Sequence, residues 1–135
     1  MSNARDISDM KETQVAHAWV NFKGNASSSP LTEENGGIRD SYNVSSVTDN
    51  GNGLYTINFD KQFANNNWAM ATAGKFSKFN NTDMPVINLD RKVDNDVAMT
   101  TSSARIACCA VTASPTNFPY VNSEVVFAVF FGESS

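Results

Sequence analysis

Turn-forming clusters rich in Asn, Gly, Asp and Ser interrupt this chain at intervals of roughly 8–12 residues, and short segments of β-forming residues lie between them. The clearest cluster is residues 49–53, where Asn-Gly supplies residues that tolerate the positive φ required by tight hairpins. The next segment, Leu54–Phe59, alternates apolar and polar side chains. A hairpin that joins residues 45–48 to Leu54–Phe59 is therefore predicted.

Other segments have the same β-forming character. They are residues 15–22, 38–47, 68–75, 85–89, 97–111 and 123–131, of which 97–111 is either one long strand or two with a bend near 102–103. No helix-period segment long enough for a crossover lies between them, which excludes a parallel βαβ topology. We predict an all-β fold over residues 15–135: one antiparallel β-sandwich or jelly-roll-like domain of about 7–9 strands.

The segment 125–131 is the longest apolar run, and it is strand-sized, well short of the roughly 18 residues that span a bilayer. Its aromatic residues Phe127, Phe130 and Phe131 do not share one face, so the strand is expected to be central or covered on both sides. We expect no membrane insertion.

Residues 1–14 are polar and lack the apolar region of a secretory signal, so synthesis in a cytoplasm without export by that route is expected. Asp9 with Glu12 resembles a capping box. The segment is interpreted as a short helix or an arm that becomes ordered against a partner. It is the one segment assigned outside the sandwich.

The composition is that of a single globular domain: 135 residues, 41% hydrophobic and 18% charged, with a formal net charge of −4. The ten basic residues are scattered, and Arg91-Lys92 is the only adjacent pair. A nucleic-acid-binding surface needs clustered Lys and Arg. Nucleic acid is therefore excluded as an expected partner.

No motif for catalysis stands out. His17, the single histidine, lies in a β segment with no nucleophile or orienting acid nearby in the sequence, which is typical of a partly buried, hydrogen-bonded strand residue. Cys108 and Cys109 are adjacent, so their side chains point to opposite faces of a strand and an ordinary disulfide between them is not expected. We predict no enzyme activity and no cofactor.

Acidic residues gather at Asp90, Asp94 and Asp96. A solvated charged loop is the favoured interpretation. A calcium site is the alternative, because clustered oxygen ligands suit that ion, although Arg91 and Lys92 lie inside the cluster. We predict no metal site.

Three aromatic residues are candidates for stacking on sugar rings if they are exposed: Trp19, Trp68 and Tyr120. In a small β domain such residues more often belong to the core. If they gather on one exposed face, a stand-alone carbohydrate-binding β-sandwich is the alternative function.

Two stretches of the sequence are similar to a known module. Residues 18–22 (AWVNF) followed by residues 37–59 (GIRDSYNVSSVTDNGNGLYTINF) resemble a module of tailed bacteriophages, found in marine and cyanobacterial phages and often at the end of predicted tail-fibre proteins. The resemblance implies a non-enzymatic virion structural protein, a homotrimer displayed on the particle with other virion proteins. Such a protein is a tail-fibre tip or a capsid decoration that contributes to attachment to a host-surface glycan or protein.

Residues 25–36 look like an insertion relative to that module, which usually has a short Gly-rich turn here. Ser29-Pro30 is placed like an N-cap and first helical residue, so a loop with at most one helical turn is predicted. Recognition often resides in loops on a rigid sandwich. The candidate interaction residues in this loop are Asn25, Ser28, Pro30, Glu33, Glu34 and Asn35.

Overall fold

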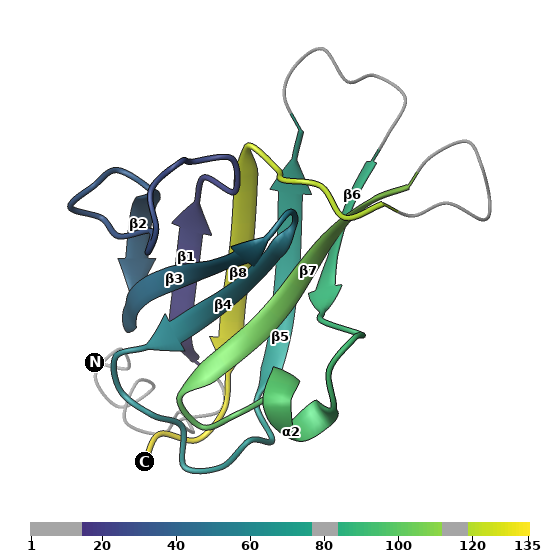
Figure 1. Ribbon diagram of the computed structural model, residues 1–135. Helices are drawn as coiled ribbons and strands as arrows, with labels where there is room; N and C mark the ends of the chain where they lie inside the picture. The colour runs from purple at the N-terminus through teal and green to yellow at the C-terminus, as the bar shows by residue number, and fades with distance from the viewer. Residues whose placement is uncertain (1–14, 77–83, 112–118) are drawn as a thin grey trace, which may run out of the picture.

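The computed structural model describes residues 15–76, 84–111 and 119–135 (Figure 1). Within these ranges it contains the following elements: β1 (Ala16–Phe22), β2 (Ile38–Tyr42), β3 (Val44–Gly51), β4 (Leu54–Phe59), β5 (Ala69–Lys75), β6 (Met84–Leu89), the short helix α2 (Asn95–Ala98), β7 (Ser103–Val111) and β8 (Val125–Phe131). The predicted arm or helix at residues 1–14 lies outside the described residues.

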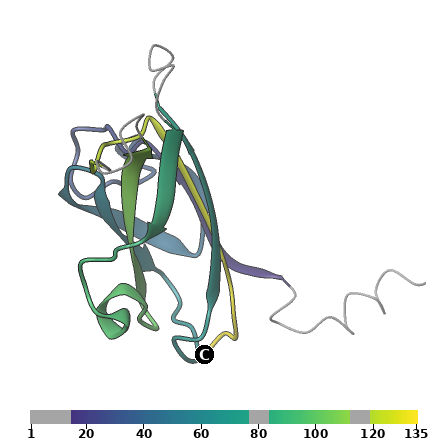
Figure 2. The ribbon, with the colours of Figure 1, turned by 90° about the vertical axis from the view of Figure 1, so that its right-hand side faces the viewer.

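The strands form two four-stranded sheets. Sheet A has the order β2-β1-β8-β5 and sheet B the order β3-β4-β7-β6, and every neighbouring pair is antiparallel. Figures 1 and 2 show the sheets as two layers, with β3, β4 and β7 crossing in front of β1, β8 and β5 in the first view. This architecture confirms the predicted all-β sandwich.

The predicted hairpin is present and is formed by β3 and β4, with Val47 opposite Ile57 and Thr48 opposite Thr56. Its turn depends on Gly53, which has a φ of 72°. A Cβ atom there would lie 2.5 Å from the carbonyl oxygen of Cys108, so β7 approaches too closely for any other residue. The positive φ of the turn and the close approach of β7 therefore both require glycine at position 53.

The core fills the space between the sheets. On the sheet A side, buried and more exposed residues alternate along β1 and β8. The inward-facing residues are apolar and of different sizes (Ala18, Val20, Phe22, Val126, Ala128 and Phe130). At one end, Trp68 lies in an aromatic cluster with Phe59, Phe63 and Phe130, and its ring centroid is 5.3 Å from that of Phe130. The indole Nε1–H donates to the carbonyl of Thr100 at 2.8 Å.

A polar contact inside the core joins sheet B to two loops. The buried hydroxyl of Tyr55 donates to the carbonyl of Gly24 at 2.6 Å and lies 2.8 Å from Oδ1 of Asn122. The same Asn122 oxygen accepts a hydrogen bond from the amide of Gly53 at 2.8 Å. Burial raises the pKa of Tyr55 well above its usual range, with small contributions from Cys108 and Asp49.

The structure corrects the prediction for residues 97–111. β7 begins only at Ser103, and Val97 belongs to α2 instead of a strand. The first backbone bonds of this helix run from the amides of Val97 and Ala98 to the carbonyl of Asp94, both at 2.9 Å. A single helical turn has too few residues to show a helical period in the sequence, which explains why it was not predicted.

Candidate functional site

The outer face of sheet A is apolar over the middle of the sheet, whereas polar groups lie toward its edge strands: Arg39 donates to Oδ1 of Asn21 at 3.4 Å, and Lys75 lies directly opposite Val125. One row of directly opposed residues crosses the sheet from Tyr42 through Trp19 and Val129 to Ala71. Tyr42 is 52% exposed and Phe127, one row away, is 43% exposed. Neither β1 nor β8 contains an Asp, Glu, Lys or Arg residue. An antiparallel sheet with one solvated face usually has polar residues there, so this face differs from the common pattern.

The alanines of β5 leave a shallow hollow in this face. It has a volume of about 400 Å³ and is lined mainly by Trp19, Ala71, Ala73, Phe127 and Val129. Bulky side chains of β1 and β8 therefore form one wall, and the small side chains of the edge strand β5 form the floor beside them. The hollow can receive an apolar side chain from another molecule.

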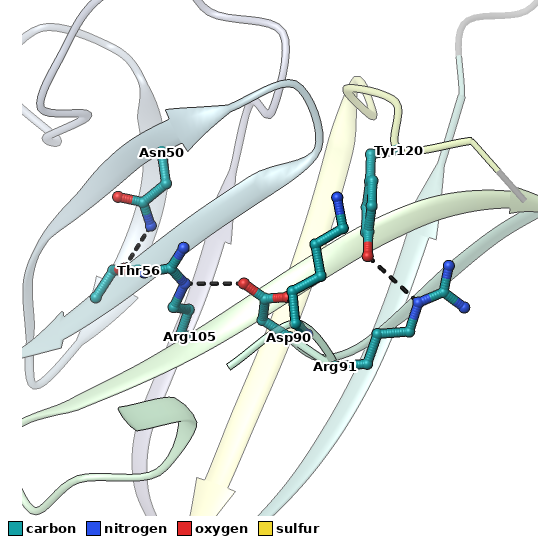
Figure 3. Close-up of polar contacts among 7 residues, drawn as sticks. Asn50, Thr56, Asp90, Arg91, Arg105 and Tyr120 are labelled. Carbon is teal, nitrogen blue, oxygen red and sulfur yellow. Dashed lines mark hydrogen bonds and ion pairs between the residues drawn. The ribbon is translucent and has the colours of Figure 1, made fainter. Parts of the chain in front are cut away.

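The outer face of sheet B is polar over β3 and β4. The amide of Asn58 donates to Oγ of Ser46 and to Oγ1 of Thr48, both at 3.0 Å. Asn50 donates to Oγ1 of Thr56 at 2.6 Å (Figure 3). The side chains on this face therefore hydrogen-bond to one another across the strands.

An ion pair continues this polar region onto β7. Nε of Arg105 lies 2.8 Å from Oδ2 of Asp90, whose side chain is fully buried (Figure 3). The other carboxylate oxygen of Asp90 accepts a hydrogen bond from the amide of Lys92 at 3.0 Å. The prediction of a solvated loop is wrong for Asp90, because β7 supplies a cation that the local sequence does not show.

A second hollow, of about 360 Å³, lies on the outer face of sheet B where β6 and β7 meet residue Tyr120. Nε of Arg91 donates to the Tyr120 hydroxyl at 3.3 Å, and Nζ of Lys92 lies 4.4 Å from the centroid of the Tyr120 ring (Figure 3). Cys109 of β7 also lines the hollow. Arg91, the ring of Tyr120 and the thiol of Cys109 therefore line one hollow, and Lys92 lies against the Tyr120 ring beside it.

The three predicted sugar-stacking residues are not brought together. Trp19 lies on the outer face of sheet A, and Tyr120 lies on the outer face of sheet B. Trp68 is only 3% exposed and so does not meet the exposure condition for a sugar-stacking residue; it belongs to the core, where its ring packs on three phenylalanines. Tyr120 is the one of the three that adjoins both a hollow and polar groups.

The loop between β1 and β2 is held to the sandwich by Leu31, which is buried and exchanges backbone hydrogen bonds of 2.8 and 2.9 Å with Val47. Pro30 begins no helical turn, since the turn starts at Thr32. There the side chains of Thr32 and Asn35 accept hydrogen bonds from each other's amides at 3.0 and 3.2 Å. Asn35 also donates to the carbonyl of Pro30 at 2.8 Å. Asn35 therefore acts first as a structural residue of the loop.

The acidic residues of this loop face outward. Glu33 and Glu34 line a polar hollow with Ser41 and Asp60, and Oγ of Ser41 donates to Glu33 at 2.7 Å. Asn25 and Pro30 are exposed and Ser28 is partly buried on the preceding stretch. Whether these residues bind a partner stays a prediction.

His17 and Cys108 lie apart from these hollows, whereas Cys109 lines the hollow beside Tyr120. The contacts of the His17 ring are the carbonyl of Lys61, at 3.4 Å, and the ring of Phe63, whose centroid is 4.2 Å away. Cys108 is buried with Sγ 2.9 Å from Oγ of Ser123, and burial raises the pKa of its thiol despite that hydrogen bond. Cys109 points to the opposite face, as predicted, and is partly exposed.

In the part of the chain that the structure describes, no group of three or more His, Cys, Asp and Glu residues is placed to hold a metal ion. The calcium alternative for Asp90, Asp94 and Asp96 is therefore not supported, since both carboxylate oxygens of Asp90 have other partners. The described segments also contain no helix with the length and apolar character needed to cross a bilayer.

Comparisons of the chain with protein-family models, with curated proteins and with solved structures gave no match.

Proposed function

We propose that this chain is a non-enzymatic structural protein of a bacteriophage virion that self-associates through the outer face of sheet A and is displayed on the particle as a homotrimer. Its proposed position is either the tip of a tail fibre or the surface of the capsid. The phage origin is supported by the similarity of residues 18–22 and 37–59 to a tail-fibre module. The single structural observation that supports the proposal is the apolar outer face of sheet A.

The physical argument concerns the strand β8. Its outer residues Val125, Phe127, Val129 and Phe131 are all apolar, and two of them are large aromatic rings exposed by 43% and 37%. Covering apolar surface contributes about 25 cal/mol per Å². Monomeric proteins rarely expose a contiguous apolar patch larger than a few hundred Å². We propose that a second copy of the chain covers this patch, because another copy is present wherever the chain is made.

The test is the mass of the purified full chain, measured by size-exclusion chromatography with light scattering. We expect about three times the 14.7 kDa chain mass. A single-chain mass over the whole accessible concentration range contradicts the proposal.

A charge on the outer face of sheet A should separate the chains. Phe127→Asp places an unpaired carboxylate in the apolar patch, and we expect it to reduce the mass to that of one chain with an unchanged circular-dichroism spectrum. Thr56→Asp is the matched control, because it adds the same charge to the outer face of sheet B, directly opposite Arg105. If both variants keep the mass of the parent, sheet A is not the interface.

The location is tested on particles. Mass spectrometry of purified virions should detect the chain, and electron microscopy should place it on the tail or the capsid. Residues 1–14 are proposed to anchor the chain on the particle. Deletion of these residues tests that role: we expect a folded, self-associating domain that is no longer incorporated into particles. Incorporation at the parent level would contradict the anchoring role.

A further inference from the structure

We propose that the hollow beside Tyr120, on the outer face of sheet B, binds a pyranose ring that carries a carboxylate, such as a uronic-acid residue of an acidic glycan. This inference does not depend on self-association or on the virion, since it concerns the opposite face of the sandwich from sheet A.

The first argument is the shape and lining of the hollow. Its volume of about 360 Å³ is at the small end of ligand sites, which suits one or two sugar rings. Its apolar surface comes from Val86, Ala107 and Val111, and Asn88 contributes an amide that can donate and accept hydrogen bonds. A pyranose has the complementary character, because its axial C–H groups form an apolar face and its hydroxyls form a polar rim.

The second argument is the ring of Tyr120, which lines the hollow and lies beside Arg91 in Figure 3. An aromatic ring with a polar end is well suited to a ligand that has apolar and hydroxylated surfaces. Two hydrogen bonds hold this residue: the side-chain amide of Asn52 donates to its backbone carbonyl at 2.9 Å, and Nε of Arg91 donates to its hydroxyl at 3.3 Å. The ring is thus positioned before a ligand arrives.

The third argument is charge. The one ion pair among the described residues joins Arg105 to Asp90, so neither Arg91 nor Lys92 has a carboxylate partner there. Nε of Arg91 is bonded to Tyr120, and no described residue accepts a hydrogen bond from its terminal Nη groups. Both cations are exposed, and the acidic residues Asp94 and Asp96 that follow them in the sequence make no ion pair with them. An anionic ligand can therefore pair with these cations, and a guanidinium binds a carboxylate particularly well.

The test uses trigalacturonate and trimannuronate as acidic probes and the fully methyl-esterified trigalacturonate as a neutral probe of nearly the same shape. Titrations are followed by calorimetry and by ¹⁵N-resolved NMR of the full chain. We expect at least one acidic probe to bind about tenfold more tightly than the ester and to shift the amide signals of Arg91, Cys109 and Tyr120. No binding of either acid, equal affinity for acid and ester, or shifts confined to other residues would overturn the proposal.

Three variants assign the interaction. Tyr120→Ala should weaken both acid and ester about fivefold or more, whereas Tyr120→Phe should keep most of the affinity because the ring remains. Lys92→Gln should weaken only the acid, and 0.5 M salt should have the same effect. Lys61→Gln is the control, since it removes the same charge from an exposed residue outside the hollow. An equal effect of Lys61→Gln and Lys92→Gln would show that only net charge matters and would contradict a site.

The parent chain offers a second measurement in case a Tyr120 variant does not fold. Cys109 lines the hollow and Cys108 is buried, so iodoacetamide should modify Cys109 first. A saturating acidic probe should slow that reaction severalfold, and the neutral ester at the same concentration should not. An unchanged rate at saturation would mean that the acid binds elsewhere. The mass of the assembly is measured in the same samples, which keeps this result separate from the test of self-association.

Discussion

The outer faces of the two sheets differ, although both sheets have four antiparallel strands and both supply one half of the same core. Sheet A presents Trp19, Phe127 and Val129, whose mainly apolar side chains line a shallow hollow. Sheet B presents Asn58, Thr48 and their neighbours, which hydrogen-bond to one another along the surface. The comparison shows that the β3–β4 part of sheet B is completed by hydrogen bonds within the chain, whereas the middle of sheet A is suited to being covered by another molecule.

The reason lies in the alternation of each strand. β4 places Tyr55, Ile57 and Phe59 inward and polar or half-buried residues outward, as a sheet with one solvated face requires. β8 places apolar residues on both sides, and it lies between β1 and β5 in the middle of its sheet. Its central position, as predicted, accounts for the pairing of its backbone on both edges. It does not account for the apolar outer side chains.

The largest effect should come from the inner side of β8. Phe130→Ala removes a fully buried ring that contacts Phe59 and Trp68, and we expect the free energy of unfolding to fall by about 3–5 kcal/mol. Phe127→Ala, on the outer side, should lower it by less than about 1 kcal/mol at concentrations where only the single chain is present. Denaturant unfolding measures both values. Similar losses would mean that the outer face of sheet A already stabilises the single chain.

A smaller loss should follow from breaking the ion pair on sheet B. Asp90→Ala leaves Arg105 without its carboxylate and the amide of Lys92 without its acceptor, so we expect a loss of about 2–3 kcal/mol. Asp94→Ala is the control: that carboxylate is exposed and makes no capping hydrogen bond to α2. Thermal unfolding of the two variants should separate them clearly. Equal stability would show that Arg105 is adequately solvated without Asp90.

The buried hydroxyl of Tyr55 should contribute about 1–2 kcal/mol at neutral pH, because Tyr55→Phe leaves the carbonyl of Gly24 without its buried donor. The contribution depends on pH. Burial raises the pKa of Tyr55 in the folded state, whereas the unfolded residue ionises near its usual pKa of about 10. The folded state therefore binds the proton more tightly, and stability is lost as the pH rises above about 10.

The variant Tyr55→Phe lacks this ionisation. The difference in unfolding free energy between the parent and Tyr55→Phe should be constant below about pH 9 and should shrink above about pH 10. Unfolding curves at several pH values measure the difference, and the other tyrosines and lysines cancel in it. A constant difference up to pH 11 would mean that Tyr55 titrates normally in the folded state.

The smallest effects on stability should come from a reciprocal exchange on the two outer faces. Val129→Thr adds a hydroxyl to the apolar face of sheet A, and Thr56→Val removes the acceptor of Asn50 from sheet B. Each should change the free energy of unfolding of the single chain by no more than about 0.5–1 kcal/mol. Only Val129→Thr should weaken self-association, as measured by the concentration at which the assembly dissociates. If Thr56→Val weakens it equally, the two faces do not differ in role.

Much of the fold follows from local patterns. The turn at residues 49–53 and the alternation of Leu54–Phe59 predicted the β3–β4 hairpin, because turn geometry and side-chain period are properties of a few neighbouring residues. The apolar, non-alternating segment 125–131 was likewise the signal of a central strand. The same segment also indicated that one outer face carries apolar side chains. Only the register of Val129 with Trp19 and Ala71 showed where that face lies.

The sites could not be predicted in this way. Asp90 looked like one of three solvated acids until the pairing of β6 with β7 placed Arg105 beside it. Trp68 and Tyr120 were equal candidates for sugar stacking, yet one closes the core and the other borders a hollow with Arg91 and Lys92. The sequence by itself determined which segments are strands and where they turn, since those depend on short-range sterics and periodicity. Only the tertiary structure decided which side chains share a face, because residues far apart in the chain become neighbours through strand pairing and sheet packing.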